Sequence, residues 1–165
     1  MTELVAYSDG KCFIPLKRFE AEAKRLSGRR VILEIAEPQN DGKRRMFHAT
    51  LREIYANLPD EIGDNFVNYD HFRYWCEIKC GFAFVETEVC ASKAEAERFL
   101  SFIRRREPYA IVTREKNVVT LYTAKSTKVG CMEGVEFNKL VDAVLHYASA
   151  LIGIKPEEAE RIAAR

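Results

Sequence analysis

Residues 134–152, GVEFNKLVDAVLHYASALI, carry the most regular hydrophobic pattern in this 165-residue chain. Apolar side chains recur every three or four positions, which is the spacing of one face of an α-helix. Gly153 follows directly, and a glycine commonly ends a helix. The apolar face consists of Phe137, Leu140, Val141, Val144, Leu145, Ala148, Leu151 and Ile152. We predict a long helix whose wide apolar face also meets a partner, through Phe137, Leu140, Val144 and Leu151.

Upstream of this helix, the pattern changes repeatedly between helical and strand spacing. We predict helices over 43–58, 68–80 and 93–106, strands over 82–89, 109–113 and 118–123, and a terminal helix from Pro156. Residues 60–67 are expected to form a loop or a single turn. Within helix 68–80, the inward side is expected to hold Phe72, Trp75, Cys76 and Cys80, and the outward side Arg73, Tyr74 and Glu77.

The N-terminal part reads as two strands over 4–8 and 12–15, a helix over 17–27 and a strand over 30–36. No run of regular β-α-β crossovers follows, so the fold class is predicted to be α+β, with a small mixed or antiparallel sheet packed against several helices. We divide the chain into an N-terminal hairpin and helix over 1–30 and a main domain over 31–165, expected to form one compact unit.

Composition excludes several classes of protein. Lys and Arg number 26 against 25 Asp and Glu, a formal net charge of +1, so the chain does not bind polyanions through bulk charge. A hydrophobic content of 47% excludes an intrinsically disordered chain. No apolar run reaches the roughly 20 residues that cross a bilayer, and no signal-peptide pattern opens the sequence. We expect a cytoplasmic protein without a membrane partner.

No constellation of residues predicts catalysis or a cofactor. The five cysteines Cys12, Cys76, Cys80, Cys90 and Cys131 lack the paired spacing of a zinc site and are interpreted as reduced, mostly packed side chains. Asp60, Glu77 and Lys79 loosely fit the pattern of a Mg²⁺-dependent DNA nuclease. We predict a non-enzyme that needs no metal or cofactor, and keep the nuclease as an alternative.

Clustered basic residues are the strongest functional signal. Arg44, His48 and Arg52 share one face of helix 43–58, with Lys43 and Arg45 beside them. A second basic segment consists of Lys125, Ser126, Thr127 and Lys128. Such side chains can neutralise phosphates without reading bases. The pattern favours nucleic-acid binding; the alternative is an ordinary solvated surface on a structural or protein-interaction module.

Several motifs resemble a known family. Residues 38–55, PQNDGKRRMFHATLREIY, resemble the polar loop and basic-aromatic helix of the phage recombination protein family NinB, also called Orf. The Arg52–Tyr55 sequence followed by His71, Arg73 and Trp75 is similar to a phage and prophage branch of that family. Towards the end of the chain, the matching positions are Ser126, Thr127, Met132, Glu136, Phe137, Leu140, Gly153–Lys155, Glu158, Ala159 and Arg161.

The resemblance implies a homodimeric α/β protein that binds single-stranded or branched DNA without catalysing a reaction. Members of the family help a recombinase replace the host single-strand-binding protein, and both proteins are therefore expected partners. On this basis we predict a phage-derived recombination mediator in the cytoplasm of a bacterial host. Residues 1–30 have no clear counterpart in the family.

Overall fold

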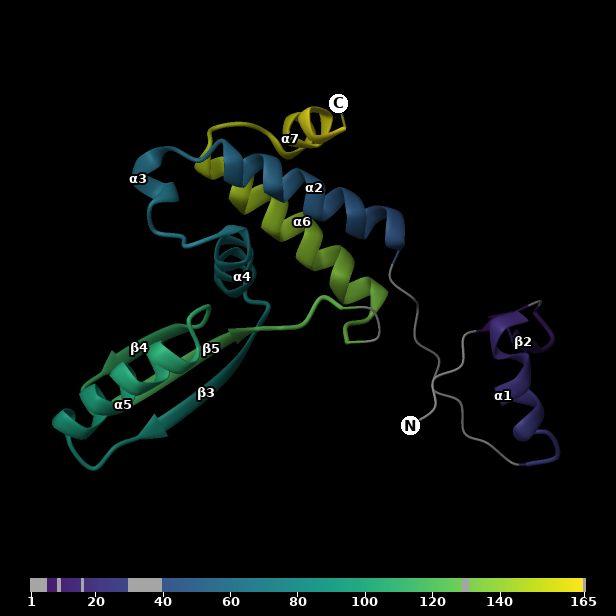
Figure 1. Cartoon of the computed structure of the whole chain (residues 1–165), viewed down its shortest axis with the longest axis horizontal. Coiled ribbons are helices and arrows are strands. Elements are labelled where there is room, and N and C mark those ends of the chain that lie inside the picture. The colour runs from purple at the N-terminus through teal and green to yellow at the C-terminus, as the bar shows by residue number, and fades with distance from the viewer. Residues whose placement is uncertain (1–5, 9, 16, 30–39, 129–130, 165) are drawn as a thin grey trace. The chain divides into compact units, whose positions relative to one another are not determined.

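The computed structural model describes the chain except for residues 1–5, 9, 16, 30–39, 129–130 and 165. The chain divides into two compact units, Met1–Ile35 and Ala36–Arg165 (Figure 1). The predicted strand over 30–36 lies outside the described residues, so it stays a prediction.

The first unit consists of a hairpin and a short helix. Strands β1 (Ala6–Ser8) and β2 (Phe13–Pro15) pair antiparallel. Gly10 adopts a φ of +86° in the intervening turn, a conformation that costs little only for glycine. The 3₁₀ helix η1 (Lys17–Phe19) leads into α1 (Glu20–Arg25). The hairpin and the helix predicted from the sequence are therefore confirmed over the described residues.

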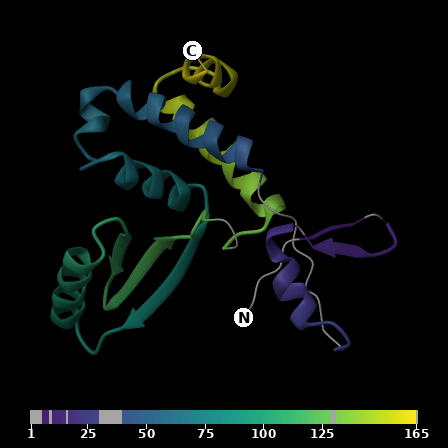
Figure 2. The ribbon, with the colours of Figure 1, turned by 45° about the vertical axis from the view of Figure 1, so that its right-hand side comes forward.

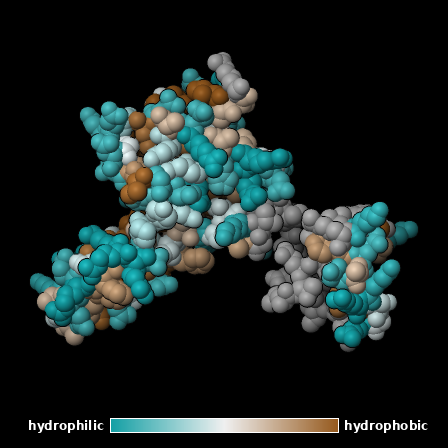
Figure 3. All heavy atoms as spheres, in the orientation of Figure 1, coloured by the Kyte–Doolittle hydropathy of each residue, from teal (hydrophilic) through white to brown (hydrophobic). Residues whose placement is uncertain are grey.

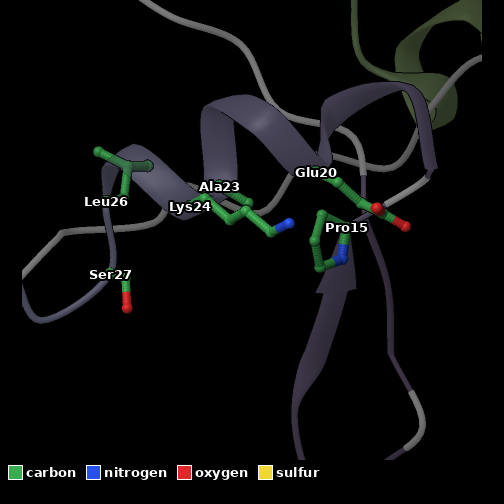
Figure 4. Close-up of a pocket in the computed structure, with 6 residues that line it drawn as sticks. All are labelled: Pro15, Glu20, Ala23, Lys24, Leu26 and Ser27. Carbon is green, nitrogen blue, oxygen red and sulfur yellow. The ribbon is translucent and has the colours of Figure 1, made fainter.

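A hollow lies beside α1 in this unit. Its lining includes Pro15, Glu20, Lys24 and Leu26 (Figure 4). None of the predicted site residues lines this hollow, because all of them belong to the second unit.

Helices build one half of the second unit. Its helices are α2 (Asp41–Ala56), the single turn α3 (Asp60–Gly63), α4 (Tyr69–Lys79), α6 (Gly134–Leu151) and α7 (Pro156–Ala163). Helices α2 and α6 lie side by side, with α7 against both (Figures 1 and 2). Their shared core contains Phe47, Leu51, Phe72, Phe137, Leu140 and Ala159. Among the described residues, no helix has the length and apolarity needed to cross a bilayer.

Side-chain caps begin three of the helices. The Asn40 Oδ1 accepts from the Lys43 backbone N–H at 3.0 Å and the Asn68 Oδ1 accepts from that of His71 at 2.9 Å. The Ser92 Oγ accepts from the Glu95 N–H at 3.2 Å, which is one half of a capping box. The Glu95 carboxylate accepts from the Ala91 N–H instead of from that of Ser92. The caps explain why these helices begin where they do.

A small antiparallel sheet builds the other half. Strands β3 (Ala83–Val89), β4 (Ile111–Glu115) and β5 (Val118–Ala124) have the spatial order β3-β5-β4. Helix α5 (Lys93–Arg106) packs on β4 and β5 and closes a second core with Leu100, Val112 and Val119. Hydrophilic side chains cover most of the visible surface around α5 (Figure 3). The predicted α+β class is confirmed, and this sheet is antiparallel.

The expected outward side of α4 is wrong at two positions. Arg73 and Glu77 are buried, with Glu77 fully inaccessible to solvent. Helix α4 contacts α2, α6 and β5, so more than one of its faces is covered. A prediction of one inward face and one outward face could not accommodate neighbours on several sides.

The expected partner surface on α6 needs a similar correction. Phe137, Leu140 and Val144 are fully buried in the helical core of their own chain, and Leu151 is half-buried. Because α2, α4 and α7 all pack on α6, its wide apolar face is used within the unit. The first three side chains are therefore not available to a partner on this surface.

Candidate nucleic-acid interface

The basic stripe of α2 meets the start of α4. Phe47, Leu51 and Ile54 point into the core, which leaves Arg44, His48 and Arg52 along another side of the helix. The His48 Nδ1 lies 3.0 Å from the Tyr69 hydroxyl oxygen, and the Arg52 guanidinium lies 5.1 Å from the centre of the Tyr69 ring. Tyr69 thereby fixes the stripe against α4.

The charges of three arginines act on His48. Burial lowers the pKa of His48, and the positive charges of Arg73, Arg52 and Arg44 lower it further, against an opposing effect of Asp70. Burial also raises the pKa of Tyr69 to about 12, so its hydroxyl stays protonated and can donate to His48. His48 is therefore neutral at pH 7, and the positive charge of this surface comes from the arginines.

Arg73 and Glu77 form a buried pair beneath this surface. The Arg73 Nη1 donates to the Glu77 Oε1 at 2.8 Å, and the Nη2 donates to the Asp70 Oδ1 at 3.3 Å. Arg73 Nε and Glu77 Oε2 are buried, and neither has a hydrogen-bond partner within the described part of the chain. Burial raises the pKa of Glu77 to about 7, although the Arg73 charge opposes this shift. Near neutral pH, Glu77 therefore offsets the Arg73 charge only in part.

An aromatic group lies next to the cations. The Arg73 guanidinium stacks 4.0 Å from the centre of the Tyr74 ring. Tyr74 in turn stacks on Tyr109, with ring centres 5.6 Å apart and an interplanar angle of 27°. The Asn68 amide donates to the Tyr109 hydroxyl at 3.0 Å, and the His71 ring lies 5.8 Å from that of Tyr109. The α2–α4 surface thus consists of Arg44, His48, Arg52, Tyr74 and Tyr109, and the buried Arg73 supports it through its contact with the Tyr74 ring.

Other predicted cations are engaged in ion pairs. The Lys43 ammonium lies 3.1 Å from the Asp142 carboxylate. Arg44 makes a looser contact of 3.9 Å with Asp41, and the Arg45 Nε donates to the Asp41 carbonyl at 3.4 Å. The pair with Asp142 removes Lys43 from the set of freely available positive charges.

The second basic segment belongs to different elements. The Lys125 ammonium contacts the Glu136 carboxylate at 2.7 Å and lies 5.9 Å from the centre of the Phe84 ring. Thr127 is buried, while Ser126 and Lys128 are exposed. These contacts tie the segment to α6 and β3, so the structure does not join it to the α2–α4 surface.

The residues of the nuclease pattern are not brought together. The Glu77 carboxylate faces Arg73 in the interior, whereas the Lys79 ammonium is exposed and lies 5.7 Å from the centre of the Trp75 ring. Asp60 is the exposed first residue of α3. In the part of the chain that the structure describes, no three His, Cys, Asp or Glu side chains are grouped to hold a metal ion.

Sequence reasoning missed Arg73 and Tyr109 as members of the candidate site. Arg73 is four residues before Glu77, and a pair at this spacing on a helix is a recognisable signal. Tyr109 lies in the connection between α5 and β4, and its stacking on Tyr74 depends on tertiary structure. No local pattern could have identified it.

Comparisons with protein-family models, with curated proteins and with solved structures found no match to this chain. The likeness to the NinB family is therefore based on the quoted motifs alone.

Proposed function

We propose that the chain binds single-stranded DNA through the α2–α4 surface. The observation that carries the proposal is the pair of accessible arginines on α2, Arg44 and Arg52. Tyr69 joins them to α4, where the Tyr74 ring stacks on that of Tyr109. Proteins that bind single strands without sequence preference combine phosphate-neutralising cations with aromatic rings on which bases stack. Both components are present on this surface.

Local clustering compensates for the near-neutral charge of the chain. Arg52 and Arg45 are exposed, and Arg44 has a solvent-accessible side chain with only a distant contact to Asp41. Within the residues that the structure describes, none of these three arginines has a close ion pair, so their charges are available to a phosphate. Since bound phosphates release counterions, binding should be strong at low salt and should weaken as salt rises.

The role as a recombination mediator is a narrower proposal that rests on the family resemblance. It adds a homodimer, a phage origin and exchange with a single-strand-binding protein. The role requires binding without strand cleavage, and cleavage in the presence of Mg²⁺ would favour the nuclease alternative.

A titration with matched charge variants tests the proposal. Labelled oligothymidylate is titrated at low salt with the wild type, with the double variant Arg44→Glu/Arg52→Glu and with the control Arg104→Glu/Arg105→Glu. Both double variants change the net charge equally, but Arg104 and Arg105 are exposed at the end of α5. We expect the first variant to lose binding and the control to keep it.

Equal loss in both double variants, or no binding by the wild type at low salt, overturns the proposal. Equal loss would indicate an effect of bulk charge, and no binding would favour the protein-interaction module. Thermal unfolding of each variant establishes that a loss of binding is not a loss of folding.

A further inference from the structure

Among the described residues, strand β3 pairs only with β5 and forms an open edge of the three-stranded sheet (Figure 1). Backbone bonds from the Lys125 N–H to the Phe82 carbonyl and from the Cys90 N–H to the Asn117 carbonyl flank its pairing with β5. In an antiparallel pair, residues that bond to the neighbouring strand alternate with residues that do not. The even-numbered residues therefore bond to β5, and Ala83, Val85, Thr87 and Val89 direct their backbone groups away from it.

The side chains of β3 are exposed on both faces of the sheet. Every residue of the strand after Ala83 is exposed, including Phe84 at 58%, Val85 at 58% and Val89 at 66%. Such a row of apolar side chains beside free backbone groups is a ready template for another strand. The edge is long enough for a seven-residue partner.

Two carboxylates determine the chemistry of that partner. Glu86 lies opposite Leu121 and Glu88 lies opposite Val119, so neither has a basic cross-strand neighbour on β5. The nearby Arg114 on β4 is paired with Glu97 at 2.9 Å. A strand added to the free edge would bring its own side chains directly beside Glu86 and Glu88.

From this arrangement we propose that β3 accepts an extended basic segment of a partner protein as a fourth strand. Lys or Arg at alternate positions would face Glu86 and Glu88, and β-branched residues between them would pack beside Val85 and Val89. Main-chain hydrogen bonds to residues 83–89 supply the affinity, and the alternating side chains supply the specificity.

A second copy of this chain fits the edge poorly. If two β3 strands paired antiparallel with Thr87 opposite Thr87, Glu86 of each copy would lie opposite Glu88 of the other. Like charges directly across a strand pair are destabilising. Acidic residues on an exposed edge therefore act against self-pairing, and they leave the edge free for a basic strand.

The test uses a labelled peptide of alternating Lys and Val residues and the full chain. Anisotropy titration at moderate salt measures its binding, compared with the same peptide N-methylated on alternate residues and with an alternating Glu and Val peptide. We expect the N-methylated peptide to bind at least about tenfold more weakly, because it keeps the charge but loses the backbone donors. We expect the acidic peptide not to bind.

A charge-reversal variant and an edge variant complete the test. Glu86→Lys/Glu88→Lys should reverse the preference, so that the acidic peptide binds and the basic one does not. Thr87→Pro removes an outward N–H while it leaves the bonds to β5 in place, and it should weaken binding by a similar factor.

Equal binding of the parent and N-methylated peptides overturns the proposal, as does retention of the basic preference after charge reversal. A concentration-dependent dimer that Thr87→Pro abolishes would also overturn it, since the second copy would then be the occupant of the edge. If Thr87→Pro does not fold, the peptide backbone comparison still decides the question.

Discussion

Arg73 and Glu77 form an ion pair across one turn of α4, with 2.8 Å between Nη1 and Oε1, in a position where Glu77 has no solvent contact. Removing two charges from water is costly, and attraction between them recovers that cost only when every polar atom is satisfied. Among the described residues, Arg73 Nε and Glu77 Oε2 have no partner. The pair is therefore expected to limit stability while it positions the Arg73 guanidinium against the Tyr74 ring.

Glu77→Gln should change how stability depends on pH. Burial raises the pKa of Glu77 from 4.5 to about 7, so the folded state binds more protons than the unfolded state between these values. This contribution is complete below pH 4.5 and is lost as the pH rises through 7. This contribution to the free energy of unfolding amounts to about 3 kcal/mol. The variant lacks it, because the Gln side chain does not titrate. Relative to wild type, the variant should gain stability by about this amount between pH 4.5 and pH 8.

Urea unfolding of both proteins across this range measures the difference. His48 and His71 have lowered pKa values and change stability in the opposite direction, but they contribute equally to both proteins. A difference that is constant with pH would show that Glu77 does not titrate as described.

Arg73→Met should be strongly destabilising at pH 8, because Glu77 loses its partner in the interior and must either stay charged there or take up a proton on folding. The expected cost is about 3–5 kcal/mol, and it should be smaller at acidic pH, where Glu77 is protonated. The double variant Arg73→Met/Glu77→Leu should recover most of the loss, since well-packed apolar side chains replace a buried pair without penalty. Chemical unfolding of the three proteins checks the order; a double variant less stable than the single one would contradict it.

The helices and strands could be predicted from the sequence more accurately than the tertiary contacts between them. The hydrophobic spacing of α6 and the glycine that follows it, Gly153, are local features, and the structure confirms the helix that they predict. The burial of Arg73 and Glu77 is not local, because it depends on contacts of α4 with several elements. Patterns within one helix reveal which face is apolar but not how many neighbours the helix has.

The candidate site likewise combines local features that the sequence reveals with long-range contacts that it does not. Arg44, His48 and Arg52 could be aligned from their spacing, whereas the pair of Lys43 with Asp142 joins residues 99 positions apart. The contact between Tyr74 and Tyr109 also requires the tertiary fold. Local sequence therefore indicated the stripe, and long-range contacts decided which of its charges stay available.

Phe137→Ala should lower the free energy of unfolding of the chain without altering its oligomeric state. Phe137 is fully buried, and its ring lies 6.1 Å from that of Phe47 in an edge-on contact. Truncation of a buried Phe costs about 3–5 kcal/mol. Leu151→Ala, at a half-buried position of the same helix, should cost less. Urea unfolding and size-exclusion mass measurement of both variants distinguish a residue of the core from a residue of an interface. Loss of a dimer without loss of stability would contradict the core role of Phe137.

The salt dependence of DNA binding should be shallow. Arg44, Arg45 and Arg52 can neutralise about three phosphates, which corresponds to a slope near −2 for log affinity against log salt on a single strand. Arg52→Gln should reduce the slope by about 0.7, while Lys128→Gln should leave it unchanged because that residue belongs to the separate basic segment. Titrations at several salt concentrations measure both slopes. Equal reductions would mean that the two segments bind the strand together.

His48 should make this binding sensitive to acid. Its pKa is lowered by burial and by Arg73, Arg52 and Arg44, so the ring is neutral at pH 7 and gains a proton only below its ordinary value of 6.5. A bound phosphate would favour the protonated ring, and affinity should therefore rise as the pH falls below 6.5. His48→Gln should bind normally at pH 7.5 and lack most of this rise. His71, whose pKa is also lowered, provides the matched comparison through His71→Gln. If His71→Gln removes the rise and His48→Gln does not, the strand lies over the aromatic group and not over the arginine stripe.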